Sequence, residues 1–283
     1  MSLTLSQMPN PMLGMLKAAG TFTRKPRGEI QLPKLESSLT TLAIDAAHLK
    51  AYRDICGFAD NGALPIPYPQ VIAAPMHIHL MGQPQFPLPL LGLVHLRNKI
   101  MQTRPLSPTE GYGVKVALGE GRQTDKGFDF DLLTTFSDAQ GVQVWSAVTT
   151  ILFRNRPLGG GAKKPPPKVD ANISEYAVVK APADIGRRYG AIAGDRNPIH
   201  LYAVTAKLFG YPRAIAHGMW SLARCAAVAE AKLSQPVREL SVQFKQPLLL
   251  PGKAAVKVVT SGKGADYSLL GDGGKVHLTG FIA

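Results

Sequence analysis

Two neighbouring stretches decide how this chain is interpreted: Gly194-Asp195-Arg196-Asn197-Pro198-Ile199-His200 and Ala216-His217-Gly218-Met219. Asn197 and Pro198 are typical of the N-cap and first residue of a helix, which we expect to continue to Leu208. Asp195 then lies in the loop entering this helix, and His200 lies in its first turn. Because a helix N-terminus favours an ionised carboxylate and a neutral imidazole, the pair is suited to hold a water molecule and transfer its protons.

The two stretches resemble the signature of the MaoC-like, hydratase-2 family of hotdog-fold enzymes. In that signature an aromatic residue precedes Gly-Asp-x-Asn-Pro, an aliphatic residue and His, and Tyr189 supplies the aromatic residue here. The family adds water to trans-2-enoyl thioesters and forms (R)-3-hydroxyacyl products. The resemblance implies that Asp195 and His200 are the catalytic pair and that Asn197 orients them. It also implies that the Gly218 backbone N–H binds the thioester oxygen.

Further residues are expected at the substrate. His217, the neighbour of the donor glycine, is expected either to be structural or to line the pocket entrance. Three cations are candidates for phosphate contacts: Arg213, Lys245 and Arg196. His77, His79 and His95 could face the pocket, but we interpret them as ordinary buried or exposed histidines. The sequence has no metal ligands at close spacing, and the chemistry that the resemblance implies needs neither a metal nor an organic cofactor.

Composition limits the remaining possibilities. With 283 residues, 45% hydrophobic and 18% charged, the chain is typical of a globular protein. It lacks the ~18 consecutive apolar residues that span a bilayer. Cys56 and Cys225 lie in apolar helical patterns, so we expect buried thiols rather than a disulfide. Prolines in the basic N-terminal region argue against a targeting helix, so we expect a cytoplasmic protein.

The net charge of +13 is concentrated towards the C-terminal half, with +4 in residues 1–160 and +9 in residues 161–283. The basic residues are scattered and no aromatic platform lies among them, which argues against a nucleic-acid partner. A thioester of coenzyme A or of an acyl carrier protein fits better, since both carriers are anionic. Scattered solvated charge is the alternative interpretation.

A Gly- and Pro-rich segment divides the chain near its middle. Three glycines and then three prolines occur within residues 154–168, a composition that breaks both helices and strands. We therefore predict four parts: an irregular N-terminal arm (1–30), a first repeat (31–157), a linker (158–168) and a second repeat (169–283).

The two halves repeat each other. Tyr68-Pro69-Gln70-Val71-Ile72-Ala73-Ala74-Pro75-Met76 corresponds to the nine residues Tyr211–Met219, and Tyr52 with Gly57 corresponds to Tyr189 with Gly194.

Each copy continues into alternating strands. In the first half we expect them near 91–101, 113–119, 128–136 and 142–153, and in the second near 237–246, 253–261, 267–270 and 275–282. Val142, Val144 and Val148 show this alternation. One segment, 215–233, has the apolar spacing of a long central helix. A helix clasped by a curved antiparallel sheet, twice over, is an α+β double hotdog fold; the name of the fold comes from the resemblance.

The copies differ in their chemistry. Ala74-Pro75 stands where the second copy has His217-Gly218, and proline has no N–H to donate. The first copy also lacks the His of the signature, so we predict that it is non-catalytic. The resemblance to the eukaryotic-type hydratases implies that such a copy widens the acyl tunnel for bulky or long chains. Three functions stay open: an (R)-specific hydratase or dehydratase, a hotdog thioesterase, and a non-catalytic subunit that binds acyl thioesters. Homodimerisation is left open as well.

Overall fold

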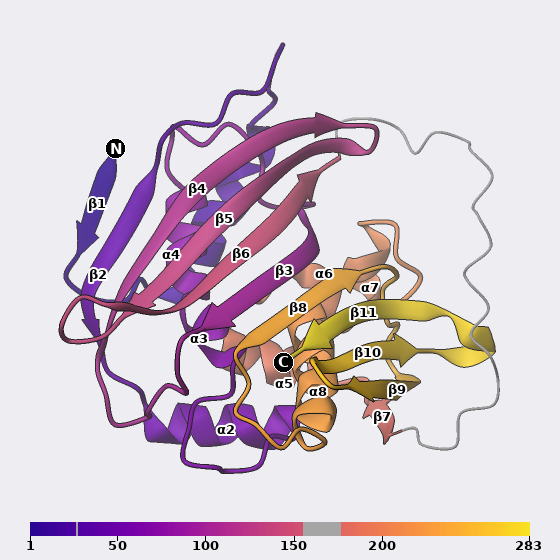
Figure 1. Cartoon of the computed structure of the whole chain (residues 1–283). Helices are drawn as coiled ribbons and strands as arrows, with labels where there is room; N and C mark the ends of the chain where they lie inside the picture. Colours follow the sequence, from indigo (N-terminus) through magenta and orange to yellow (C-terminus); the bar gives the residue numbers. More distant parts are fainter. Residues whose placement is uncertain (27, 155–176) are drawn as a thin grey trace.

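The computed structural model describes residues 1–26, 28–154 and 177–283 (Figure 1). The predicted linker, 158–168, lies outside these residues. Within these residues, eleven strands form one curved sheet in the order β1-β2-β4-β5-β6-β3-β8-β11-β10-β9-β7. All neighbouring strands are antiparallel except β1 and β2. Among the described residues, no helix has the length and apolar character needed to cross a membrane.

The sheet consists of two equivalent halves, as the repeat predicts. The first half contains β2 Glu36–Leu42, β4 Tyr112–Thr124, β5 Gly127–Ser137, β6 Gln143–Phe153 and β3 Val94–Gln102. The second contains β7 Ala177–Ala181, β9 Gly252–Ser261, β10 Gly264–Leu270, β11 Val276–Ile282 and β8 Glu239–Phe244. The spatial order within each half is the same. The halves join where β3 pairs with β8, from Arg97 opposite Gln243 to Met101 opposite Glu239.

The sheet curves around helices that lie on one of its faces (Figure 1). In the second half this is α8, Gly218–Glu230, which is shorter than the predicted 215–233 and contacts β8 to β11. In the first half two short helices, α3 Tyr68–Ile72 and α4 Ala74–Met81, take its place. The two halves therefore form the predicted double hotdog. Both cysteines are buried and free, as expected.

The prediction of an irregular arm over residues 1–30 is wrong, because the arm contains a strand and a helix. β1, Ser2–Leu5, extends the sheet by pairing with β2. α1, Pro11–Gly20, has Asn10 as its N-cap and packs on α4, and the short 3-10 helix Thr21–Thr23 follows it. The capping Asn followed by Pro is the sequence signal that could have shown this helix.

The expected alternation in β6 also needs correction. Val144 is buried, whereas Val142 and Val148 are exposed. The pairing with β5 steps from Trp145 directly to Gln143, so Val144 is an extra residue in a β-bulge. A bulge reverses which face the following side chains occupy, so Trp145, and not Val148, points into the core.

Candidate functional site

The Gly-Asp-x-Asn-Pro stretch connects two helices whose ends place its side chains. α5, Ile185–Ala193, ends at Gly194, whose φ of 69° is left-handed and favours glycine. Asp195 follows, and its carboxylate Oδ1 accepts the N–H of Asn197 at 3.1 Å. Asn197 in turn accepts the Ile199 N–H and caps α6. The capping role predicted for Asn197 is confirmed.

The helix that carries His200 is shorter than predicted. α6 spans Pro198–Leu201, and Tyr202 is extended before α7, Ala203–Lys207, begins. The expected single helix to Leu208 is therefore two helices. His200 still lies in the first turn, is 8% exposed, and donates its Nδ1–H to the Ile215 carbonyl at 2.8 Å. Since a carbonyl can only accept, the neutral ring keeps its lone pair on Nε2.

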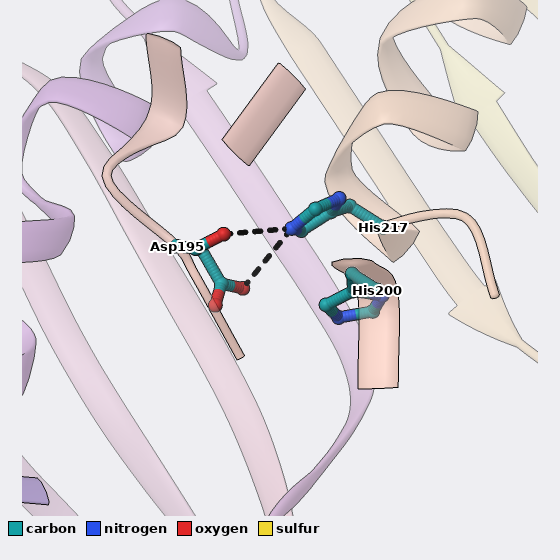
Figure 2. A group of neighbouring side chains, drawn as sticks. All are labelled: Asp195, His200 and His217. Atoms are coloured by element: carbon teal, nitrogen blue, oxygen red, sulfur yellow. Dashed lines mark hydrogen bonds and ion pairs between the residues drawn. The ribbon is translucent and has the colours of Figure 1, made fainter. Parts of the chain in front are cut away.

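Of the two roles expected for His217, its buried position at the centre of the site fits the structural role and not the pocket entrance. Its ring stacks on that of His200 with centroids 3.7 Å apart. Its Nε2–H donates to the backbone carbonyl of Asp195 at 3.0 Å and lies 3.8 Å from the Asp195 carboxylate. Figure 2 shows Asp195, His200 and His217 grouped together, with both contacts of His217 to Asp195.

The environment favours neutral imidazoles beside an ionised carboxylate. Burial lowers the pKa of His217 to about 3, and the adjacent His200 adds to this effect. Burial also lowers the pKa of His200, against the opposing effect of Asp195. For Asp195, burial would raise the pKa, but the two histidines and the Asn197 N–H outweigh it. The Asp195 side chain is 44% exposed because it faces a cavity.

Tertiary structure brings together a ligand set that sequence spacing did not show. Asp195, His200 and His217 each have a potential metal-ligand atom within 4.8 Å of the others. However, His217 uses Nε2 on the Asp195 carbonyl, and its Nδ1 is buried without a partner. The cluster therefore fits a hydrogen-bonded acid–base site better than a chelate.

Gly218 begins α8 directly after His217. As the first residue of the helix, its N–H has no acceptor within the helix, and the positive end of the helix dipole lies here. A Cβ on Gly218 would lie 3.1 Å from a ring carbon of Phe244. The position therefore favours glycine, and Gly218 lines the cavity described next.

A cavity of about 1100 Å³ connects these residues with the first half of the fold. Asp195, His200 and Gly218 line it. Its walls in the first half are mostly apolar side chains: Val71, Ala74, Ile78, Met81, Leu90, Leu93, Leu132, Ile151 and Leu152. The short helices α3 and α4 thus border a space that extends away from the signature residues.

Of the cations predicted to contact phosphate, the cavity lining includes Lys245 but neither Arg196 nor Arg213, both of which are exposed. Lys126, from the β4–β5 turn of the first half, also lines the cavity. Desolvation lowers the pKa of Lys245, and repulsion from Lys126 contributes. In the described part of the chain, no carboxylate lies within ion-pair distance of either lysine.

Two histidines of the first half also line the cavity, contrary to our interpretation of them as ordinary residues. His77 is buried and bonds Thr134 Oγ1 at 2.8 Å. His95 lies on β3. Burial lowers its pKa, and the Coulombic interaction with Asp195 opposes this effect in part. Neither lies in a recognisable motif, so no local sequence signal could have shown them. His79 is not part of the lining.

Comparisons with known proteins agree with this architecture. Residues 163–276 match the family described as MaoC like domain. The 3-hydroxyacyl-thioester dehydratase X of Mycobacterium tuberculosis (strain ATCC 25618 / H37Rv) is 36% identical over 278 residues, which are 97% of this chain and 98% of that protein.

Solved structures show the same relationship. The crystal structure of HtdX of Mycobacterium tuberculosis superposes with a TM-score of 0.75 at 33% identity, covering 87% of this chain and 98% of that chain. A MaoC-like dehydratase from Phytophthora capsici shares the fold at 17% identity, with a TM-score of 0.67 and coverage of 89% and 95%.

Proposed function

Since this chain belongs to the family of MaoC-like dehydratases, and is therefore a hydro-lyase, we propose that it interconverts trans-2-enoyl and (R)-3-hydroxyacyl thioesters. The observation that carries the proposal is the grouping of the Asp195 carboxylate with the neutral His200 ring at one cavity wall, beside the free N–H of Gly218. Acid–base groups and an oxyanion donor are the two requirements for adding water across an enoyl thioester.

Each group has a defined part in the reaction. The thioester oxygen binds at the Gly218 N–H, where the helix dipole stabilises the enolate charge that develops. Water held between Asp195 and His200 Nε2 gives its hydroxyl to C3 of the acyl chain. A proton reaches C2 from the same pair, and the reverse sequence eliminates water. His217 holds the loop in place by donating to the Asp195 backbone carbonyl. The backbone N–H of Asn197 orients the Asp195 side chain by donating to its carboxylate.

The apolar part of the cavity supports binding of the acyl chain within the first repeat. That repeat has Ala74-Pro75 where the second has His217-Gly218, so it provides space and no oxyanion donor. We infer that it is a non-catalytic copy that receives the acyl tail. The predicted repeat boundaries, a cytoplasmic location and homodimerisation stay predictions.

Lys126 and Lys245 support an anionic carrier. They come from different repeats and place two positive charges at one cavity. Within the described residues neither lies at ion-pair distance from a carboxylate, although Lys126 interacts at longer range with Asp129, which also lines the cavity. We infer that they face the phosphate groups of coenzyme A or of a carrier-protein arm. A crotonyl thioester of N-acetylcysteamine lacks these phosphates, so we expect it to show a higher KM than crotonyl-CoA and a weaker dependence of KM on salt.

The proposal is tested by mixing the purified protein with crotonyl-CoA and with a longer trans-2-enoyl-CoA. Loss of the conjugated double bond without release of thiol is expected. Release of thiol would instead indicate the alternative thioesterase, and binding without reaction would indicate a non-catalytic subunit. An (R)-specific 3-hydroxyacyl dehydrogenase coupled to the product tests the stereochemistry.

The residue assignment is tested with Asp195→Asn and His200→Gln, which preserve size and remove acid–base function. Each is expected to lower kcat by about two to four decades while the melting temperature stays close to that of the wild type. Near-wild-type kcat in either variant would contradict the assignment.

A further inference from the structure

The first repeat contributes His95 to the cavity through an irregularity in β3. Asn98, Ile100 and Gln102 are buried, so even-numbered residues of this strand face the core. If the alternation continued without interruption, the side chain of the odd-numbered His95 would point to the outer face. The pairing with β6 instead steps from Arg97 to His95, so Leu96 is an extra residue. This bulge places His95 opposite Ile151, a buried residue of the cavity wall. Directly paired residues share a face, so His95 turns inward.

His95 is held in one orientation at this position. Its Nε2–H donates to the Arg97 carbonyl at 3.1 Å. Its ring lies edge-on to Phe244 of the second repeat, with centroids 4.9 Å apart and an interplanar angle of 62°. Burial lowers the pKa of His95 to about 4, so the ring is neutral near pH 7 and packs as an aromatic group.

Phe244 connects His95 to the oxyanion donor. Phe244 is the last residue of β8. Three of its ring carbons would lie 3.1, 3.2 and 3.4 Å from a Cβ added at Gly218. The ring therefore lies against the first residue of α8. Since β3 and β8 are hydrogen-bonded neighbours, the contact from His95 through Phe244 to Gly218 crosses the junction between the two repeats.

We propose that His95 is a positioning residue that holds Phe244 against Gly218 and thereby fixes the donor N–H at the thioester oxygen. The expected effect of His95 on kcat rests on the proposed function, whereas its effect on the position of Gly218 does not. On this basis the first repeat supplies part of the catalytic geometry as well as space for the acyl chain. The aromatic ring at position 95, rather than its ability to titrate, provides the effect.

The test compares His95→Ala, His95→Phe and Met101→Ala. Met101 is an exposed residue of the same strand, so its substitution controls for changes in β3. We expect His95→Ala to lower kcat about tenfold with little change in KM, because an oxyanion donor acts mainly in the transition state. His95→Phe retains an edge-on ring and is expected to restore most of kcat, and Met101→Ala to have no effect.

Hydrogen–deuterium exchange gives a readout that does not depend on activity. Exchange of the amides in residues 216–222 is expected to be faster in His95→Ala than in the wild type, and unchanged in His95→Phe and Met101→Ala. Unchanged exchange in His95→Ala, or a His95→Phe variant as impaired as His95→Ala while both remain folded, would overturn the proposal. A wild-type protein without hydratase activity would overturn the proposed function, while the exchange result would still decide the role of His95.

Discussion

Gly190 offers a way to disturb the catalytic geometry without altering any group that reacts. It lies on the face of α5 that packs against the Asp195 loop, and a Cβ there would be 2.7 Å from the Asp195 carbonyl oxygen and 3.6 Å from His217 Cε1. Real Cβ atoms essentially never come within 3.0 Å of such a neighbour, so Gly190→Ala requires a movement of at least 0.3 Å. The obstructing atom is backbone and cannot rotate away.

The carbonyl that must move is the acceptor for His217 Nε2. Its displacement shifts the Asp195 carboxylate relative to His200. A misplacement of 1 Å can cost about 10²-fold in rate, so a shift of 0.3 Å corresponds to roughly a fourfold loss of kcat. Overpacking of this kind also destabilises a protein by about 1–3 kcal/mol.

The measurement is the initial rate of crotonyl-CoA hydration, well below the melting temperature of each variant. Gly20→Ala is a matched control, since Gly20 ends a helix with right-handed φ and nothing lies within 4 Å of its Cβ position. The control is expected to retain the wild-type kcat. Unchanged kcat in a folded Gly190→Ala protein would refute the idea that the Asp195 backbone position controls catalysis.

Two further predictions concern the cavity and its buried histidines. Ala74→Phe fills the apolar part of the cavity and is expected to reduce activity on long trans-2-enoyl-CoA while crotonyl-CoA is still hydrated; equal losses on both would contradict tail binding there. Burial lowers the pKa of His77 to about 4 and of His217 to about 3. Below about pH 6.5 the unfolded chain therefore binds more protons than the folded chain, and the free energy of unfolding decreases as the pH is lowered. At pH 5 each of these histidines lowers the free energy of unfolding by about 2 kcal/mol relative to neutral pH. Urea titrations at several pH values should therefore show a steeper loss of stability with decreasing pH for the wild type than for His77→Phe.

Several features could be predicted from sequence because they depend on local chemistry. A left-handed Gly194, the Asn197 cap and the start of α6 follow from the residues themselves. The repeat was detectable because both copies keep a Tyr near the end of one helix, followed by a glycine cap. These signals placed Asp195 and His200 at one helix N-terminus, which is where the structure has them. They failed where the chain departs from regular geometry, as at Tyr202 in the predicted helix and at the bulges in β6 and β3.

By itself, the sequence of this chain determined the repeat, the family signature and the presence of Pro75 where the second copy has Gly218, because each is a property of residue identity and short-range spacing. Tertiary structure alone decided which distant side chains share the cavity. His95 and Lys126 reach it because the two halves of the sheet join at β3 and β8 and because a bulge turns the His95 side chain inward. Such contacts depend on strand register and curvature, which residue spacing does not specify.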